Sequence, residues 1–151
     1  MKLKEKQNSM KINVLIVDDE KEFTDTITKR LEMRNFTITS VYSGEAAIDV
    51  AKKIDFDVII LDVQMPGITG IDVLKKIKIK NPLTNVIMLT GEATVDNAIT
   101  GMKLGAFDFL IKPVDTELLT QKIHQAHNLK HEQEERIRKA EIENILRTRG
   151  W

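Results

Sequence analysis

The sequence predicts an α/β fold, with a doubly wound, five-stranded parallel sheet and helices on both faces. Four short runs of apolar, mostly branched residues have the composition of strands that are buried on both faces. Each strand is followed by a stretch in which apolar residues repeat at helical spacing. Strand and helix alternate five times, which implies parallel strands joined by right-handed crossovers.

Local signals place the boundaries of these elements. Ser43 is positioned to cap the second helix, Asn81 and Pro82 end the third, and Gly105 ends the fourth. Gly101 lies inside the fourth helix and should weaken it by ~1 kcal/mol relative to Ala. We expect strands at 12–17, 36–41, 58–61, 85–89 and 107–111. We expect helices at 21–34, 44–51, 70–80, 93–104 and from 115 towards 150.

The strands differ in how fully they should be covered. Thr37, Thr39 and Ser40 interrupt the apolar residues of the second strand, which is typical of an edge strand. The other four strands should be inner or well covered. We therefore predict the strand order 2-1-3-4-5 of flavodoxin-like sheets. The last helix meets no breaker before Gly150, so it should be about three times the average helix length.

Composition limits the classes of function. Lys plus Arg equals Asp plus Glu at 23 each, so no basic excess supports a nucleic-acid or membrane partner. The chain has no Cys, which excludes disulfides and thiolate catalysis and agrees with a cytoplasmic location. No apolar run approaches a membrane span, and the first ten residues lack the apolar core of a signal peptide. We expect a disordered leader at 1–10, one domain at 11–128 and a helical extension at 129–151.

Charged side chains follow two strands that should be neighbours. Asp18 and Asp19 end the first strand, and Asp62 ends the third, where the pattern predicts another apolar residue. Adjacent parallel strands lie about 5 Å apart, so these three carboxylates should lie close together. They would repel one another without a cation, and a cluster of oxygen ligands suits Mg²⁺.

Two further polar residues end the next strands. Thr90 ends the fourth strand, where its hydroxyl could donate to a phosphoryl oxygen. Lys112 ends the fifth strand, about two strand spacings from Asp62, a distance that a lysine side chain can largely bridge. Three acids, a hydroxyl and a cation at one edge of a sheet fit a phosphoryl group carried on Asp62.

These residues and their surroundings resemble a known signature. Asp18-Asp19, Asp62 with Met65-Pro66-Gly67, Thr90-Gly91 and Lys112-Pro113 look like the motifs of two-component response-regulator receiver domains, over about 11–125. The resemblance implies that a histidine kinase phosphorylates Asp62. It also implies that Asp18, Asp19, Asp62 and the backbone carbonyl of Gln64 hold Mg²⁺, and that Thr90 and Lys112 bind the phosphoryl group.

The same resemblance places Phe109 at an aromatic switch position. Because Gly101 and Gly105 should loosen the fourth helix, we predict that Thr90 and Phe109 move together and remodel the surface of the fourth helix, fifth strand and fifth helix, which would control a partner or output domain. The Lys112-Pro113 bond would be cis, and Gln64 would tune the lifetime of the phosphate. The segment 102–109 resembles receivers at the front of enhancer-binding transcription activators. Such a chain is a CheY-like signalling module rather than an enzyme, and could form a homodimer through this surface or through its last helix.

Each site residue also has a plainer interpretation. Asp18 and Asp19 could cap the next helix, Asp62 could be a turn residue, and Thr90 and Lys112 could be solvated strand ends. Phe109 could be a core residue that shares one face of its strand with Phe107 and Ile111. The joint placement at successive strand ends favours the functional interpretation.

The last helix leaves two questions open. His124, His127 and His131 share one helix face and could bind a metal or form a polar face, and no other ligand cluster supports the metal. Acidic and basic residues four positions apart after 131 favour a helix there. It could form a coiled-coil dimer or remain solvated, and an apolar side is expected from Ile142, Ile145, Leu146 and Trp151.

Two other functions use the same acids. A Mg-dependent phosphohydrolase with an aspartyl nucleophile generally has a second Asp two residues later, but this chain has Gln64 there. It also lacks a cap domain that would enclose a substrate. A degenerate receiver acting only as a scaffold is disfavoured by the complete set of acids.

Overall fold

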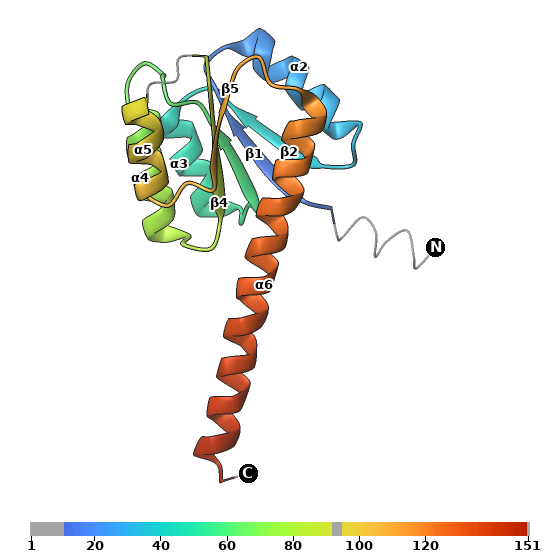
Figure 1. Ribbon diagram of the computed structural model, residues 1–151, viewed down its shortest axis with the longest axis vertical. Helices are drawn as coiled ribbons and strands as arrows, with labels where there is room; N and C mark the ends of the chain where they lie inside the picture. The colour runs from blue at the N-terminus through green and yellow to red at the C-terminus, as the bar shows by residue number, and fades with distance from the viewer. Residues whose placement is uncertain (1–10, 92–94, 151) are drawn as a thin grey trace.

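The computed structural model describes residues 11–91 and 95–150, and it contains the predicted five-stranded parallel sheet in the order β2-β1-β3-β4-β5 (Figure 1). The strands are β1 Asn13–Val17, β2 Thr37–Val41, β3 Val58–Leu61, β4 Asn85–Thr90 and β5 Asp108–Ile111. The helices are α2 Lys21–Glu32, α3 Gly44–Lys53, α4 Gly70–Lys80, α5 Val95–Lys103 and α6 Thr116–Thr148. The predicted fold class and strand order are confirmed. The expected leader at 1–10, the start of the fourth helix at 93 and Trp151 lie outside the described residues.

Helices cover both faces of the sheet, with α2 and α6 on one face and α3, α4 and α5 on the other (Figure 1). Alternate residues of β1 enter the two cores: Val14 and Ile16 pack with α2 and α6, whereas Leu15 and Val17 pack with α3 and α4. Because β1 and β3 are buried on both faces, all their residues are apolar except Asn13 at the start of β1.

Several predicted boundaries are confirmed. The Ser43 hydroxyl caps α3 by accepting a hydrogen bond from the Ala46 amide at 3.1 Å. Helix α4 ends at Lys80, directly before Asn81 and Pro82. Gly105, with φ +98°, follows the end of α5 in the left-handed conformation that glycine adopts without steric cost. These helix boundaries depend on the local backbone preferences of single residues, and they can therefore be predicted from the sequence.

The region around β5 differs from expectation. β5 is the second edge strand and is only half buried, and Ile111 is exposed. Phe107 precedes the strand and packs with the α2 and α6 core, whereas Phe109 packs with the opposite core. The expectation that these two rings share a face is wrong, because strict alternation applies only within the regular strand.

Gly101 also has a different role from the one expected. A Cβ atom at this position would lie 2.6 Å from the Met88 sulfur. The absence of a side chain therefore lets α5 pack closely on β4. The residue supports packing between these elements in addition to lowering the intrinsic stability of the helix.

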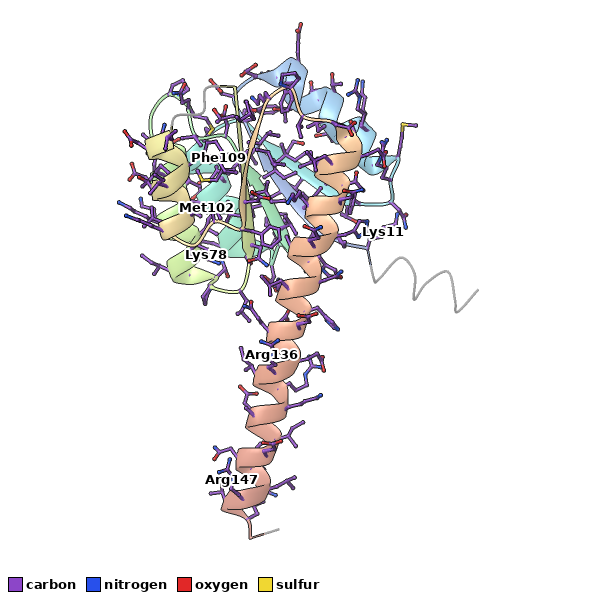
Figure 2. All side chains as sticks on the ribbon, viewed as in Figure 1. Lys11, Lys78, Met102, Phe109, Arg136 and Arg147 are labelled. Atoms are coloured by element: carbon purple, nitrogen blue, oxygen red, sulfur yellow. The ribbon has the colours of Figure 1, made fainter. Side chains whose placement is uncertain are left out.

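Helix α6 has two parts. Its first half packs on the sheet through Leu119, Ile123 and Ala126, and the last buried residue is Lys130. Beyond about residue 135 the helix projects away from the sheet, and its side chains are exposed (Figures 1 and 2). Although α6 is 33 residues long, neither it nor any other described helix is both long and apolar enough to cross a membrane.

Candidate functional site

The ends of β1 and β3 bring two acidic side chains together. Val17 pairs with Leu61 in the parallel ladder, so Asp18 and Asp62 are the next residues on adjacent strands. The Asp62 amide donates to the Val17 carbonyl at 2.9 Å, and the Asp18 amide donates to the Val41 carbonyl at 3.2 Å. Both residues are nearly inaccessible, at 2% and 4% exposure. Backbone pairing therefore holds two carboxylates in a buried position.

A third carboxylate completes this acidic group. Asp18, Glu20 and Asp62 each place a carboxylate oxygen within 4.8 Å of the others. An Asx-type turn helps to bring Glu20 back, because its amide donates to Asp18 Oδ1 at 2.9 Å. Asp19 is exposed and does not belong to this group among the described residues. Glu20 was not chosen from the sequence, although the acidic run Asp18-Asp19-Glu20 was the available signal.

Lys112 reaches this acidic group from β5. Its Nζ lies 2.5 Å from Asp18 Oδ2, 3.2 Å from Glu20 Oε1 and 3.7 Å from Asp62 Oδ2. The Lys112 amide donates to the Thr90 carbonyl at 2.8 Å, which fixes the start of the side chain beside β4. The peptide bond between Lys112 and Pro113 is cis. The Lys112 side chain thus reaches from the end of β5, past the end of β4, to the acidic group at the ends of β3 and β1.

An aromatic ring also contacts the ammonium group. Lys112 Nζ lies 4.3 Å from the centroid of the Phe23 ring, in the range of a cation–π interaction. Phe23 belongs to the amphipathic pattern of α2, and nothing in that pattern distinguishes it from an ordinary core residue. Its contact with the site depends on how α2 packs against the sheet, which local sequence does not specify.

Burial and neighbouring charges have opposite effects on the pKa values of Asp18 and Lys112. Burial raises the pKa of the Asp18 carboxyl above its ordinary value, and the hydrogen bond from Lys112 only partly offsets this effect. Burial alone would lower the pKa of Lys112, but the hydrogen bond to Asp18 and the neighbouring carboxylates raise it. Three carboxylates face one ammonium group, so the site carries an excess of negative charge and favours a second cation.

The remaining predicted residues surround this centre. Thr90 ends β4 and is buried, and Phe109 is half buried against the core below α5. The Gln64 amide donates to Asp62 Oδ1 at 3.1 Å, and its exposed side chain faces a hollow of about 560 Å³. This hollow is lined by Val63, Gln64, Met65, Pro66, Thr69, Ile71 and Asn97.

Gly70 is another residue that the sequence analysis did not select. It is the first residue of α4, and a Cβ atom there would lie 2.3 Å from the Asp62 carbonyl oxygen and 2.6 Å from Val63 Cα. Only glycine allows α4 to begin this close to the backbone that carries Asp62. No motif in the sequence signals this contact.

The three histidines lie away from the acidic group. The His124 ring packs 5.2 Å from the Phe36 ring, and the His127 ring lies 6.4 Å from that of His131. His127 Nδ1 is 3.9 Å from an Asp57 oxygen, next to the start of β3, at the end of this strand opposite Asp62. Among the described residues, the group of three that could hold a metal is Asp18, Glu20 and Asp62.

The acidic group has the chemistry expected for a magnesium site. All its ligands are carboxylate oxygens, they converge from adjacent strands, and two of them are buried. Hard divalent cations prefer such oxygen ligands and usually keep several waters as well. The exposed edge of the site leaves room for those waters, since Glu20 and Asp19 face solvent.

Comparison with known proteins places this geometry in a family. The family model described as the response regulator receiver domain matches residues 14–124. Regulatory protein VanR of Enterococcus faecium is 38% identical over 104 residues, which make up 69% of this chain and 45% of that protein. Transcriptional regulatory protein ZraR of Salmonella typhimurium is 33% identical over 116 residues, or 77% of this chain and 26% of that protein. The chain spans between about a quarter and a half of the length of these curated relatives.

Solved structures give the same result. A response regulator receiver domain protein from Clostridium thermocellum is 36% identical with a TM-score of 0.74, covering 80% of this chain and 97% of its own. The receiver domain of the Francisella response regulator 1452 is 30% identical with a TM-score of 0.72, covering 78% and 97%. Sequence and architecture therefore point to the same family.

Proposed function

Because this chain belongs to the response regulator receiver domain family, we propose that Asp62 accepts a phosphoryl group from a histidine kinase in a magnesium-dependent reaction in the cytoplasm. The observation that carries this proposal is the position of Asp62: a buried carboxylate 3.7 Å from the Lys112 ammonium, in a group with Asp18 and Glu20. At the carboxyl end of a parallel strand, a lysine beside the accepting carboxylate can stabilise an anionic phosphoryl group, and the neighbouring acids can hold the cation that offsets their own charge.

The transfer itself requires little from the protein beyond position and charge. A carboxylate oxygen of Asp62 attacks the phosphorus, and the bond between phosphorus and the imidazole nitrogen of the kinase breaks. The electron pair of that bond returns to the imidazole, and Asp62 becomes an acyl phosphate. The Gln64 amide holds Asp62 Oδ1, which leaves Oδ2 facing Lys112.

Magnesium would be held by Asp18, Asp62 and the backbone carbonyl of Gln64, and the position of Glu20 makes it an additional candidate. Asp19, the other predicted ligand, is exposed outside this group and would have to turn towards it to bind the ion. When bound, the ion would neutralise the carboxylates and stabilise charge on the phosphoryl oxygens. Lys112 and the Thr90 hydroxyl would contact the phosphoryl group. Lys112 would then exchange part of its interaction with Asp18 for one with the new anion.

A change in the contacts of Lys112 could alter the molecular surface near β5. Lys112 follows β5 directly, and Phe109 lies on the same strand, beside α5, where it packs with the core (Figure 2). The surface formed by α5, β5 and α6 exposes Ile99, Met102, Ile111 and Leu118. We infer that phosphorylation shifts Thr90 and Phe109 together and changes how this surface binds an output domain, a protein partner or a second copy of the chain.

The module would therefore catalyse only its own phosphorylation and dephosphorylation. Beryllofluoride with Mg²⁺ should shift the NMR signals of α5 and β5 in the wild-type protein, whereas the Asp62→Asn variant should not respond. Acetyl phosphate should add one phosphate to the wild type and none to Asp62→Asn. Incorporation that persists in Asp62→Asn would place the nucleophile elsewhere, and rapid turnover of a generic phosphomonoester would favour a phosphohydrolase.

A further inference from the structure

The Phe23 ring and the Lys112 ammonium group meet at one side of the acidic group. Lys112 Nζ lies 4.3 Å from the ring centroid, well inside the ~6 Å over which an aromatic face attracts a cation. The lysine side chain is only 10% exposed, so little water competes with the ring for the ammonium group. Lys21 and Tyr42 make a longer contact of this kind, at 5.3 Å, but both residues are exposed. Because desolvation strengthens a cation–π interaction, the contact of Phe23 with Lys112 is the stronger of the two.

The hydrophobic core uses Phe23 less fully than the other apolar residues on its face of α2. Ile27 and Leu31 continue that face and are 3% and 0% exposed. Phe23 is only partly buried where it packs against the same core. An aliphatic side chain could supply this packing, whereas only an aromatic face also attracts an ammonium group.

The first turn of α2 fixes the backbone of Phe23 relative to the acidic group. The next residue, Thr24, is fully buried, and its amide donates to the Glu20 carbonyl at 2.9 Å. The Thr24 hydroxyl also donates to the Glu20 carbonyl, at 2.9 Å, and lies 3.2 Å from the Asp18 carbonyl as a second acceptor. The helix that carries the ring is therefore tied to the two residues whose carboxylates accept hydrogen bonds from Lys112.

The ring and two carboxylates hold the ammonium group in one position. Lys112 Nζ donates to Asp18 at 2.5 Å and to Glu20 at 3.2 Å. Asp62 Oδ2 lies 3.7 Å away, beyond hydrogen-bond range. The ring thus adds its attraction to the position in which Lys112 is bonded to Asp18 and stops short of Asp62.

Building on the magnesium-dependent function proposed above, we propose that Phe23 is a positioning residue, whose ring face holds Lys112 against Asp18 and opposes its displacement by magnesium. A divalent cation among the carboxylates repels the ammonium group, which must move away from Asp18. That movement gives up part of the contact with the ring. A weaker contact between the ring and Lys112 should therefore make magnesium binding tighter.

Fluorination of the ring tests this role with little change in its shape. Site-specific replacement of Phe23 by mono-, di- and trifluorophenylalanine withdraws electron density from the ring face step by step and weakens its attraction for a cation. Magnesium affinity, measured by calorimetry, should increase at each step, reaching about threefold in the trifluoro variant. The same series at Phe36, which packs in the same core beside His124, should leave the affinity unchanged. A flat or falling series at Phe23 would overturn the proposal.

A second background separates the charge of Lys112 from packing of the ring. In Lys112→Met, the fluorinated series at Phe23 should be flat, because no ammonium group remains to be held. A slope that persists there would assign the effect to packing and reject the positioning role. Phe23→Leu should bind magnesium like the trifluoro variant, whereas Phe23→Tyr, which keeps an aromatic face, should bind it like the wild type.

NMR of the metal-free protein examines the contact without magnesium. In the wild type, the ring should shift the protons of the Lys112 methylene next to Nζ upfield, and in Phe23→Leu these signals should return towards ordinary lysine values. Equal signals in the two proteins would contradict the contact. Phosphate incorporation from acetyl phosphate separates the two proposals. A flat magnesium series with normal incorporation rejects the role of Phe23 alone, and a sloped series without incorporation retains that role but rejects Asp62 as phosphoacceptor.

Discussion

Lys112 donates hydrogen bonds to Asp18 and Glu20 but not to Asp62: the Nζ atom lies 2.5 Å from Asp18 Oδ2, 3.2 Å from Glu20 Oε1 and 3.7 Å from Asp62 Oδ2. The ammonium group thus occupies the acidic group and partly neutralises the ligands that a metal would use. A divalent cation and Lys112 would repel each other at this distance. Magnesium binding and the position of Lys112 should therefore be coupled.

The first prediction removes the ammonium group. Lys112→Met should bind Mg²⁺ about tenfold more tightly than the wild type, a difference of ~1.4 kcal/mol, because the repulsion is lost. Isothermal titration calorimetry with MgCl₂ measures the change. Lys122→Met is the matched control, since Lys122 forms an ion pair with Asp108 at 2.8 Å outside the acidic group. Unchanged or weaker binding in Lys112→Met would show that the lysine does not compete with the metal.

The phosphorylated state of the same variant should behave differently. Phosphate incorporation from acetyl phosphate should remain possible, because Asp62 and the other acids are unchanged. The NMR shifts of α5 and β5 on phosphorylation should be largely lost, since the cation that links the anion to β5 is missing. Full shifts in Lys112→Met would assign the coupling to another residue.

The second prediction compares two acids of the group. Asp18→Asn should reduce Mg²⁺ affinity by more than about tenfold, because a buried and fixed carboxylate is lost. Glu20→Gln should reduce it by less than about threefold, because its side chain is 63% exposed and its ion pair with Lys112 is solvated. Magnesium titrations of the two variants decide the order. An equal loss in both would make Glu20 a full ligand.

The structural features that the sequence predicts correctly depend on local patterns or on the topology of parallel strands. The placement of Asp18, Asp62, Thr90 and Lys112 at one edge of the sheet could be predicted because each lies at the end of a strand, and adjacent strand ends must meet at one edge. Phe23 and Gly70 could not be found in this way. Their roles depend on how closely a helix approaches the sheet, and this distance results from packing of the whole core.

The third prediction tests the close approach at Gly70. Gly70→Ala should lower the free energy of unfolding by about 1 to 3 kcal/mol, because its Cβ would meet the backbone of Asp62 and Val63. It should also weaken Mg²⁺ binding, since relief of the clash moves Asp62. Urea unfolding and calorimetry measure the two effects. Gly91→Ala is the matched control: a Cβ there has nothing within 4 Å, so stability should stay within about 0.5 kcal/mol.

The last prediction concerns Lys130, which joins α6 to the segment before β3. Its side chain is 6% exposed, and its Nζ donates to the Phe56 carbonyl and lies 3.4 and 3.5 Å from oxygens of Asp55 and Asp57. Lys130→Met keeps most of the apolar stem but removes these interactions. We expect a loss of about 1 to 2 kcal/mol, below the usual cost of breaking a fully buried ion pair, because Asp55 is solvated.

Urea unfolding of Lys130→Met and of Lys139→Met checks this prediction. Lys139 lies on the projecting part of the same helix and is exposed, so its replacement should change the stability of a monomer by less than about 0.5 kcal/mol. A loss in Lys130→Met with no loss in Lys139→Met would assign the effect to the buried contact. Equal stabilities of Lys130→Met and the wild type would mean that apolar packing of Leu119, Ile123 and Ala126 alone holds α6 on the sheet.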